Sequence, residues 1–192
     1  MESFLTSTGL VALAEIGDKT QLLSLILAAR FRRPWPIIAG ILVATLANHA
    51  AASGLGAWLE TLASPAVLRW GLGLSFLAMA AWMLVPDEVE AGEADRGGGR
   101  LGVFGTTVVA FFLAEMGDKT QVATVALAAR YDAAFIAVVT GTTLGMMIAN
   151  VPAVLLGDRI AQRFPVRAVH GSAAAIFAAI GCATLLGVGE GF

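Results

Sequence analysis

The feature that most constrains this chain is a charged segment that occurs twice inside apolar sequence. Residues 13–30 and 113–130 are identical at 12 of 18 positions, at a constant offset of 100 residues. The first copy begins LAEIGDKTQ and the second begins LAEMGDKTQ. Because the identities include every charged residue of the segment, they indicate an internal duplication rather than a shared composition.

The surroundings of the two copies indicate a membrane protein. Apart from the Glu, Asp and Lys of each copy, residues 3–29 and 101–129 carry no charge. Placing one charge in hydrocarbon costs ~2.5–3.5 kcal/mol on insertion scales, so we expect six such charges to have a use. The chain is 14% charged, with a mean hydropathy of +0.81, whereas a soluble domain is about 25% charged. We therefore predict an all-α integral membrane protein.

Apolar stretches long enough to cross a bilayer, at ~20 residues per crossing, divide the chain evenly. We predict six transmembrane helices, at 4–29, 35–59, 66–85, 101–129, 133–157 and 168–188. Three crossings per copy require the two copies to have opposite orientations in the membrane. The fold class that follows is two inverted three-helix repeats, a plan in which many secondary transporters bind substrate near the midplane.

The boundaries and the orientation follow from the loops. We assign residues 1–86 to the first repeat and 101–192 to the second, joined by the acidic, Gly-rich connector 87–100. If the N-terminus is outside, eight arginines fall in inner loops and two, Arg69 and Arg130, in outer loops. The positive-inside rule then places both termini outside. We interpret the connector as a solvated cytoplasmic linker, with the gathering of divalent cations as an alternative.

The duplicated motif places its polar side chains close together. On a continuous helix Glu15, Asp18 and Lys19 share one face, with Gln21 at its edge. Gly17 and Thr20 fall on the opposite side, where small residues permit close packing or a local break. The second copy repeats this arrangement with Glu115, Asp118, Lys119, Thr120 and Gln121. Two inverted copies packed face to face would bring four carboxylates and two carboxamides to one point.

Such a cluster of oxygen atoms suits a divalent cation. Carboxylate and amide oxygens are the ligands that Mg²⁺, Ca²⁺ and Mn²⁺ prefer, and the motif lacks the Cys and His that favour zinc or copper. Four ionised carboxylates and two lysines have a net charge of −2, which one divalent cation or two protons would neutralise. Metal and protons are thus expected to compete for the same oxygens, and an exchanger needs only this competition.

Other polar residues leave alternatives open. Asn48 and Asn150 recur at matching places of the second and fifth predicted helices, where each either joins helices or lines the site. Lys19 and Lys119 either pair with the acidic groups while the metal is absent or extend towards an interface.

Single residues outside the motif receive structural interpretations. His49 and His170 occur singly, and we interpret each as a hydrogen-bonded structural residue, although His49 adjoins Asn48 and could handle protons or metal. We interpret Cys182 as a small core residue. Gly141 and Gly145 form a GxxxG pattern that lets helices approach closely.

Several functions find no support in the sequence. It contains no GxxxxGK[ST] loop, which leaves ATP-driven transport unsupported, and no basic cluster suggests nucleic acid. We predict no enzyme activity and no bound cofactor, because the divalent cation is the cargo. Two alternatives stay open: a six-helix exporter of a small organic solute, and an intramembrane aspartyl hydrolase that uses the paired Gly-Asp sequences.

The doubled E-x-G-D-[KR]-[TS] motif resembles that of the second calcium:proton antiporter family. That family includes Golgi-type calcium/manganese transporters and bacterial manganese exporters, and the resemblance covers nearly the whole chain. It implies metal binding by Glu15, Asp18, Glu115 and Asp118, with accessory ligands at Thr20, Gln21, Thr120, Gln121, Asn48 and Asn150.

The expected function is therefore export of Mn²⁺, with Ca²⁺ as an alternative cargo, in exchange for protons and by alternating access. The short chain resembles the bacterial branch, which implies a multi-pass protein of the cytoplasmic membrane. Its partners would be divalent metal ions, protons and the lipid bilayer. The sequence leaves the oligomeric state open, a homo-oligomer included.

Overall fold

The computed structural model describes residues 1–85, 101–131, 134–156 and 166–187, and in these ranges it contains eight helices and no strand. The first repeat contributes α1 (Glu2–Glu15), α2 (Lys19–Phe31), α3 (Pro34–Leu62) and α4 (Pro65–Trp82). The second contributes α5 (Gly102–Glu115), α6 (Lys119–Arg130), α7 (Phe135–Leu156) and α9 (Val166–Leu185). The all-α prediction is confirmed for these ranges, and the connector 87–100 lies outside them.

The duplicated segment forms two helices in each copy. Of the two alternatives left open for its small residues, the structure contains the local break, which interrupts the predicted helices 4–29 and 101–129. α1 ends at Glu15 and α2 begins at Lys19, and the same break separates α5 from α6. At the two breaks Gly17 has φ +85° and Gly117 has φ +79°. Glycine adopts this left-handed conformation without the penalty that a Cβ brings. The motif therefore encodes a turn at the point where its charged residues lie.

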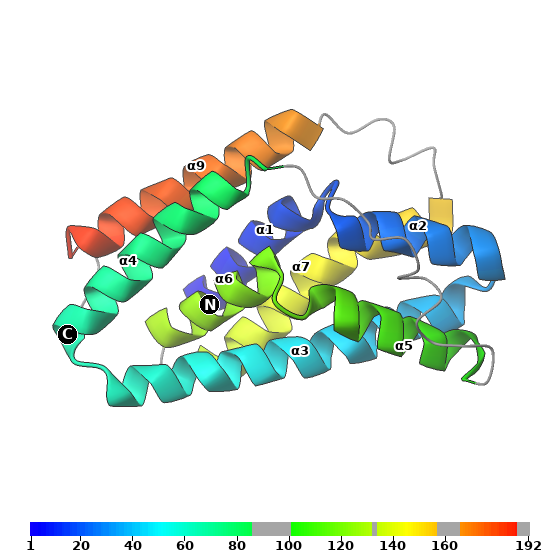
Figure 1. Cartoon of the computed structure of the whole chain (residues 1–192), viewed down its shortest axis with the longest axis horizontal. Coiled ribbons are helices and arrows are strands. Elements are labelled where there is room, and N and C mark those ends of the chain that lie inside the picture. The colour runs from blue at the N-terminus through cyan, green and yellow to red at the C-terminus, as the bar shows by residue number, and fades with distance from the viewer. Residues whose placement is uncertain (86–100, 132–133, 157–165, 188–192) are drawn as a thin grey trace.

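Equivalent helices of the two copies run in opposite directions along the long axis of the molecule. In Figure 1, α1 and α2 run from left to right, whereas α5 and α6 run from right to left. α3 likewise runs from right to left and α7 from left to right. The two breaks meet near the middle of the molecule, which places the charged residues of both copies there.

Four of the described helices are long and apolar enough to cross a membrane: α3, α4, α7 and the Arg167–Leu185 part of α9. The halves of the broken helices are shorter, with 14 and 13 residues in α1 and α2 and 14 and 12 in α5 and α6. The six crossings stay a prediction that counts each broken pair as one crossing. The outside location of the termini stays a prediction as well.

The packing of the long helices positions the breaks. α1 lies along α7, where a Cβ added at Gly145 would meet the carbonyl oxygen of Thr8 at 2.7 Å, so the GxxxG segment of α7 does allow a close approach. α4 and α9 lie side by side (Figure 1), with the rings of Phe76 and Phe177 stacked at a centroid distance of 6.3 Å. Cys182 of α9 is exposed, so its interpretation as a core residue is wrong.

Candidate metal site between the two repeats

The carboxylate of Glu15 is fully buried and is held by both repeats. Its Oε2 accepts a hydrogen bond from the hydroxyl of Thr20 at 2.5 Å, and its Oε1 accepts one from the hydroxyl of Thr120. The expectation that Thr20 points away from Glu15 is wrong, because the break turns α2 relative to α1. The hydroxyl of Thr120 comes from the opposite copy, so the two motifs meet at this carboxylate.

The lysines and aspartates of the motifs pair crosswise between the repeats. The Nζ atom of Lys19 lies 3.3 Å from Oδ1 of Asp118. The Nζ atom of Lys119 lies 3.9 Å from Oδ1 of Asp18 and also donates a hydrogen bond to the carbonyl oxygen of Val85 at 3.1 Å. Of the two readings that the sequence left open, the structure contains the pairing of each lysine with an acidic group.

Three carboxylates come close enough to share one cation. Glu15, Asp18 and Asp118 each offer one oxygen, and the three oxygens lie within 4.8 Å of one another. Two oxygens that bind one ion at about 2.3–2.6 Å cannot be more than about 5 Å apart. All three residues are at most 4% exposed. The cluster draws its oxygens from both repeats, as the face-to-face arrangement predicts.

The fourth carboxylate is held next to α3. Glu115 is 2% exposed; its Oε1 accepts a hydrogen bond from the hydroxyl of Thr45 at 2.7 Å, and its Oε2 accepts one from Nδ2 of Asn48 at 3.2 Å. Asn48 also donates to the carbonyl oxygen of Phe112. Glu115 does not belong to the cluster of three. Sequence reasoning missed Thr45, although it precedes Asn48 by one helical turn.

The two glutamines stabilise the breaks. The Oε1 of Gln21 accepts a hydrogen bond from the backbone N–H of Gly17 at 2.8 Å, and Gln121 makes the same bond to Gly117 at 2.7 Å. Nε2 of Gln21 donates to the carbonyl oxygen of Ala149 on α7 at 2.9 Å. These carboxamide oxygens therefore hold the turn instead of pointing at the three carboxylates.

Asn150 joins helices as Asn48 does, but through different partners. Its Oδ1 accepts a hydrogen bond from the hydroxyl of Ser24 on α2 at 2.7 Å, and its Nδ2 donates to the carbonyl oxygen of Met146 at 3.1 Å. The two asparagines thus occupy equivalent places in the sequence but have different partners. In this conformation Asn48 reaches an acidic residue of the motif and Asn150 ties α2 to α7.

The two histidines also differ. Nε2 of His170 lies 2.8 Å from the carbonyl oxygen of Ile16, which agrees with the interpretation of a hydrogen-bonded structural residue. His49 is 1% exposed, and neither of its ring nitrogens has a hydrogen-bond partner within the described part of the chain. The interpretation of a hydrogen-bonded residue is therefore wrong for His49 within the described part of the chain.

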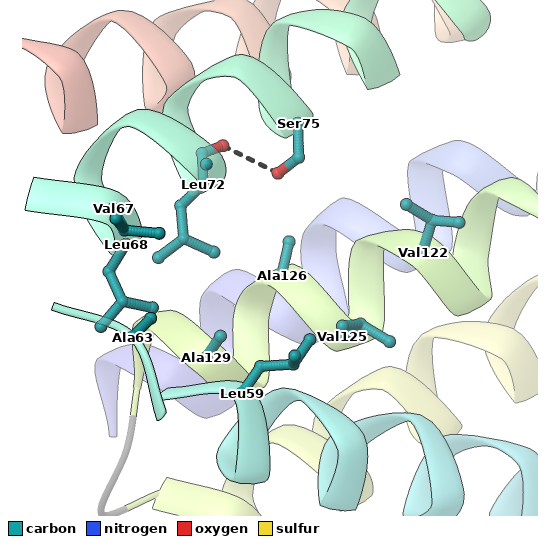
Figure 2. A pocket seen from close by; sticks show the side chains of 11 residues that line it. Leu59, Ala63, Val67, Leu68, Leu72, Ser75, Val122, Val125, Ala126 and Ala129 are labelled. Atoms are coloured by element: carbon teal, nitrogen blue, oxygen red, sulfur yellow. Dashed lines mark hydrogen bonds between the residues drawn. The ribbon is translucent and has the colours of Figure 1, made fainter. Parts of the chain in front are cut away.

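An apolar cavity lies apart from the acidic cluster. It has a volume of about 280 Å³ and lies between α3, α4 and α6. Its lining side chains include Leu59, Leu72 and Val122 (Figure 2). Its one hydroxyl, that of Ser75, donates to the carbonyl oxygen of Leu72 on its own helix. None of its lining residues belongs to the acidic cluster, and the cavity offers no ligand for a cation.

The helices and the buried oxygens together define a class: a multi-pass membrane protein built from two copies that meet at an acidic centre. Comparison with known proteins agrees. A family model described as "Divalent cation/proton antiporter GDT1" matches residues 3–91 and again residues 103–191. This chain belongs to that family. It is a transporter of divalent cations and not an enzyme, which excludes the alternative of an intramembrane hydrolase.

Individual relatives agree with the family assignment. A Vibrio cholerae protein described as "Putative manganese exporter" is 51% identical over 174 residues, which are 91% of this chain and 86% of the relative. A Synechocystis protein described as "GDT1-like protein sll0615" is 29% identical over 88% of this chain and 89% of its own length. "GDT1-like protein 4" of rice is 29% identical over 84% of this chain and 65% of the rice protein. No solved structure matches.

Proposed function

We propose that this protein exports Mn²⁺ from the cytoplasm in exchange for protons, and that Ca²⁺ is a second cargo of the same site. The observation that carries the proposal is the convergence of one oxygen each from Glu15, Asp18 and Asp118, buried and contributed by both repeats. Hard oxygen ligands suit both ions. The description of the Vibrio relative supports Mn²⁺ as the principal cargo.

Exchange follows from the charge of the site. Buried carboxylates must be neutralised by a bound cation or by protons, because a bare cluster of negative charges is unstable in a low-dielectric interior. A site that holds either the metal or protons, but not both, couples the two flows when it opens alternately to the two sides. The opposite directions of the two copies in Figure 1 supply the symmetry that such opening requires.

The remaining candidate residues have supporting places in this proposal. Thr20 and Thr120 orient Glu15 by hydrogen bonds, and Asn48 orients Glu115 next to the cluster. Glu115 completes the charge needed to balance a divalent cation against two lysines. Three of the expected accessory ligands form other hydrogen bonds in this conformation, to backbone N–H groups or to a neighbouring helix: Gln21, Gln121 and Asn150. Their side chains would have to rotate before they could bind metal.

The proposal includes the membrane arrangement. Six crossings, in two inverted repeats over 1–86 and 101–192, put both termini on one side of the membrane. The distribution of loop arginines makes that side the outside and puts the connector 87–100 in the cytoplasm. The membrane is the bacterial cytoplasmic membrane. A single chain supplies all the ligands of the cluster, so the mechanism does not depend on a homo-oligomer.

Flux measurements in proteoliposomes test the proposal. Purified protein is reconstituted, a pH gradient is imposed, and uptake of Mn²⁺ and of Ca²⁺ is followed for wild type, Glu15→Gln and Asp118→Asn. We expect gradient-driven uptake by wild type and loss of uptake in both variants. Glu60→Gln, which removes a carboxylate near the end of α3, is the control and should transport normally. Wild-type flux that ignores the pH gradient, or normal flux in either site variant, would refute the proposal.

A further inference from the structure

The two lysines of the duplicated motif occupy different environments. The side chain of Lys19 is 20% exposed, whereas that of Lys119 is 1% exposed. Lys119 is also held by the carbonyl oxygen of Val85, just beyond the end of α4. The two residues are equivalent in sequence, so the difference arises from the conformation of the protein. The side chain of Lys119 is enclosed, and that of Lys19 is partly exposed.

We propose that Lys19 is a displaceable counter-cation: its ammonium occupies the metal-free site next to Asp118 and withdraws when a divalent cation binds there. This inference rests on the proposed function. The neighbouring carboxylates would bind the metal, whereas Lys19 would compete with the metal for Asp118.

The geometry requires this competition. Nζ of Lys19 lies 3.3 Å from Oδ1 of Asp118, and Asp118 is one of the three residues whose oxygens could hold one cation. A divalent ion on this carboxylate would lie within a few ångströms of the ammonium, and two positive charges so close in a buried site repel strongly. Lys19 can respond by moving towards its exposed side. The side chain of Lys119 is 1% exposed, so it has no comparable room to move.

The return of Lys19 would serve the other half of the transport cycle. When the metal leaves, Asp118 would otherwise keep an uncompensated negative charge inside the membrane while the site reorients, which is costly. An ammonium tethered to the same chain restores the balance without using a further ion from solution. Lys19 would thus lower the affinity for metal and speed the step in which the metal-free, protonated protein reorients.

Lysine labelling tests the proposal directly, because Lys19 and Lys119 are the only lysines in the sequence. Wild-type protein in detergent is treated briefly with an amine-reactive reagent, with and without saturating Mn²⁺, and the peptides are quantified by mass spectrometry. We expect Mn²⁺ to raise the labelling of Lys19 about fivefold, within the usual range of coupling between two sites. Labelling of Lys119 should stay low. Unchanged or reduced labelling of Lys19 would overturn the proposal.

Variants give a second, independent readout. Lys19→Gln should bind Mn²⁺ about tenfold more tightly, since its competitor is gone, while its net efflux slows and its exchange of Mn²⁺ for Mn²⁺ persists. Lys19→Arg keeps the charge and should resemble wild type. A purely structural lysine would weaken binding and both transport modes together. Wild-type flux in the same vesicles tests the proposed function. If wild type transports Mn²⁺ and Lys19→Gln behaves like wild type, only the inference about Lys19 is refuted.

Discussion

The hydroxyl of Thr120 donates a hydrogen bond to Oε1 of Glu15, a residue 105 positions earlier in the chain and in the other copy of the motif. Thr20, the equivalent residue of the first copy, donates to the second oxygen of the same carboxylate. One glutamate therefore receives both motif hydroxyls, and the other, Glu115, is held by α3. The site is built from symmetric sequence but is asymmetric in this conformation.

Removing the hydroxyl of Thr120, in the second repeat, should weaken metal binding at Glu15, in the first repeat. Thr120→Val leaves one oxygen of buried Glu15 without its donor, and a hydrogen bond to a charged group contributes about 1.5–3 kcal/mol. We expect Mn²⁺ affinity, measured by titration calorimetry, to fall at least about tenfold. The control is Thr124→Val, whose hydroxyl donates to the carbonyl oxygen of Thr120 within α6. Equal affinities for the two variants would contradict the role of Thr120.

The two equivalent asparagines should give different phenotypes. Asn48→Ala removes a donor from Glu115, so we expect weaker Mn²⁺ binding. Asn150→Ala removes the bond that ties Ser24 of α2 to α7, so we expect a lower free energy of unfolding, by about 1–3 kcal/mol. Thermal unfolding with and without Mn²⁺ separates the effects, because only Asn48→Ala should lose the stabilisation that the metal gives. Matching behaviour of the two variants would show that the asymmetry is not functional.

The break in the second copy should depend on Gly117. This residue has φ +79°, and a Cβ there would meet nothing within 4 Å, so Gly117→Ala isolates the backbone penalty of about 1–2 kcal/mol. We expect a lower unfolding temperature in detergent. Gly9→Ala, also without a neighbour within 4 Å but inside α1, should be neutral or stabilising because alanine favours helix. A stabilised Gly117→Ala would indicate that a continuous helix is preferred after all.

Close packing of α1 on α7 should depend on Gly145. A Cβ at this position would lie 2.7 Å from the carbonyl oxygen of Thr8 and 2.9 Å from the backbone N of Ala12. Because backbone atoms cannot move aside cheaply, we expect Gly145→Ala to cost about 1–3 kcal/mol of stability. Gly71→Ala on α4, where nothing lies within 4 Å, is the matched control in the same thermal-unfolding assay. A tolerated Gly145→Ala would mean that the two helices are not in close contact.

The duplication allowed much of this arrangement to be predicted from the sequence. Because identical charged residues occur in two apolar segments, we expected both copies to contribute these residues to one site, and Glu15, Asp18 and Asp118 do converge. The break at Gly17 was harder to foresee, because the flanking sequence has the apolar length of one continuous helix. Once the helix breaks there, Thr20 turns towards Glu15, and a helical wheel places it wrongly.

The asymmetry could not have been predicted, because the two copies have the same motif residues. Whether Asn48 or Asn150 reaches a motif glutamate depends on how α3 and α7 pack around them, which is a property of one conformation. The burial of Lys119 and the partial exposure of Lys19 have the same origin. Local sequence specifies the side chains of the site, and tertiary packing decides which copy holds which partner.

The central claim, that both repeats build one metal site, is tested most directly by counting Mn²⁺ ions bound per chain. Equilibrium binding to purified wild type, Asp18→Ala and Asp118→Ala should give one ion for wild type and none for either variant at the same free Mn²⁺ concentration, because each aspartate belongs to the same cluster. Two ions per wild-type chain, or one ion that survives either substitution, would show that each repeat binds metal by itself and would contradict the account.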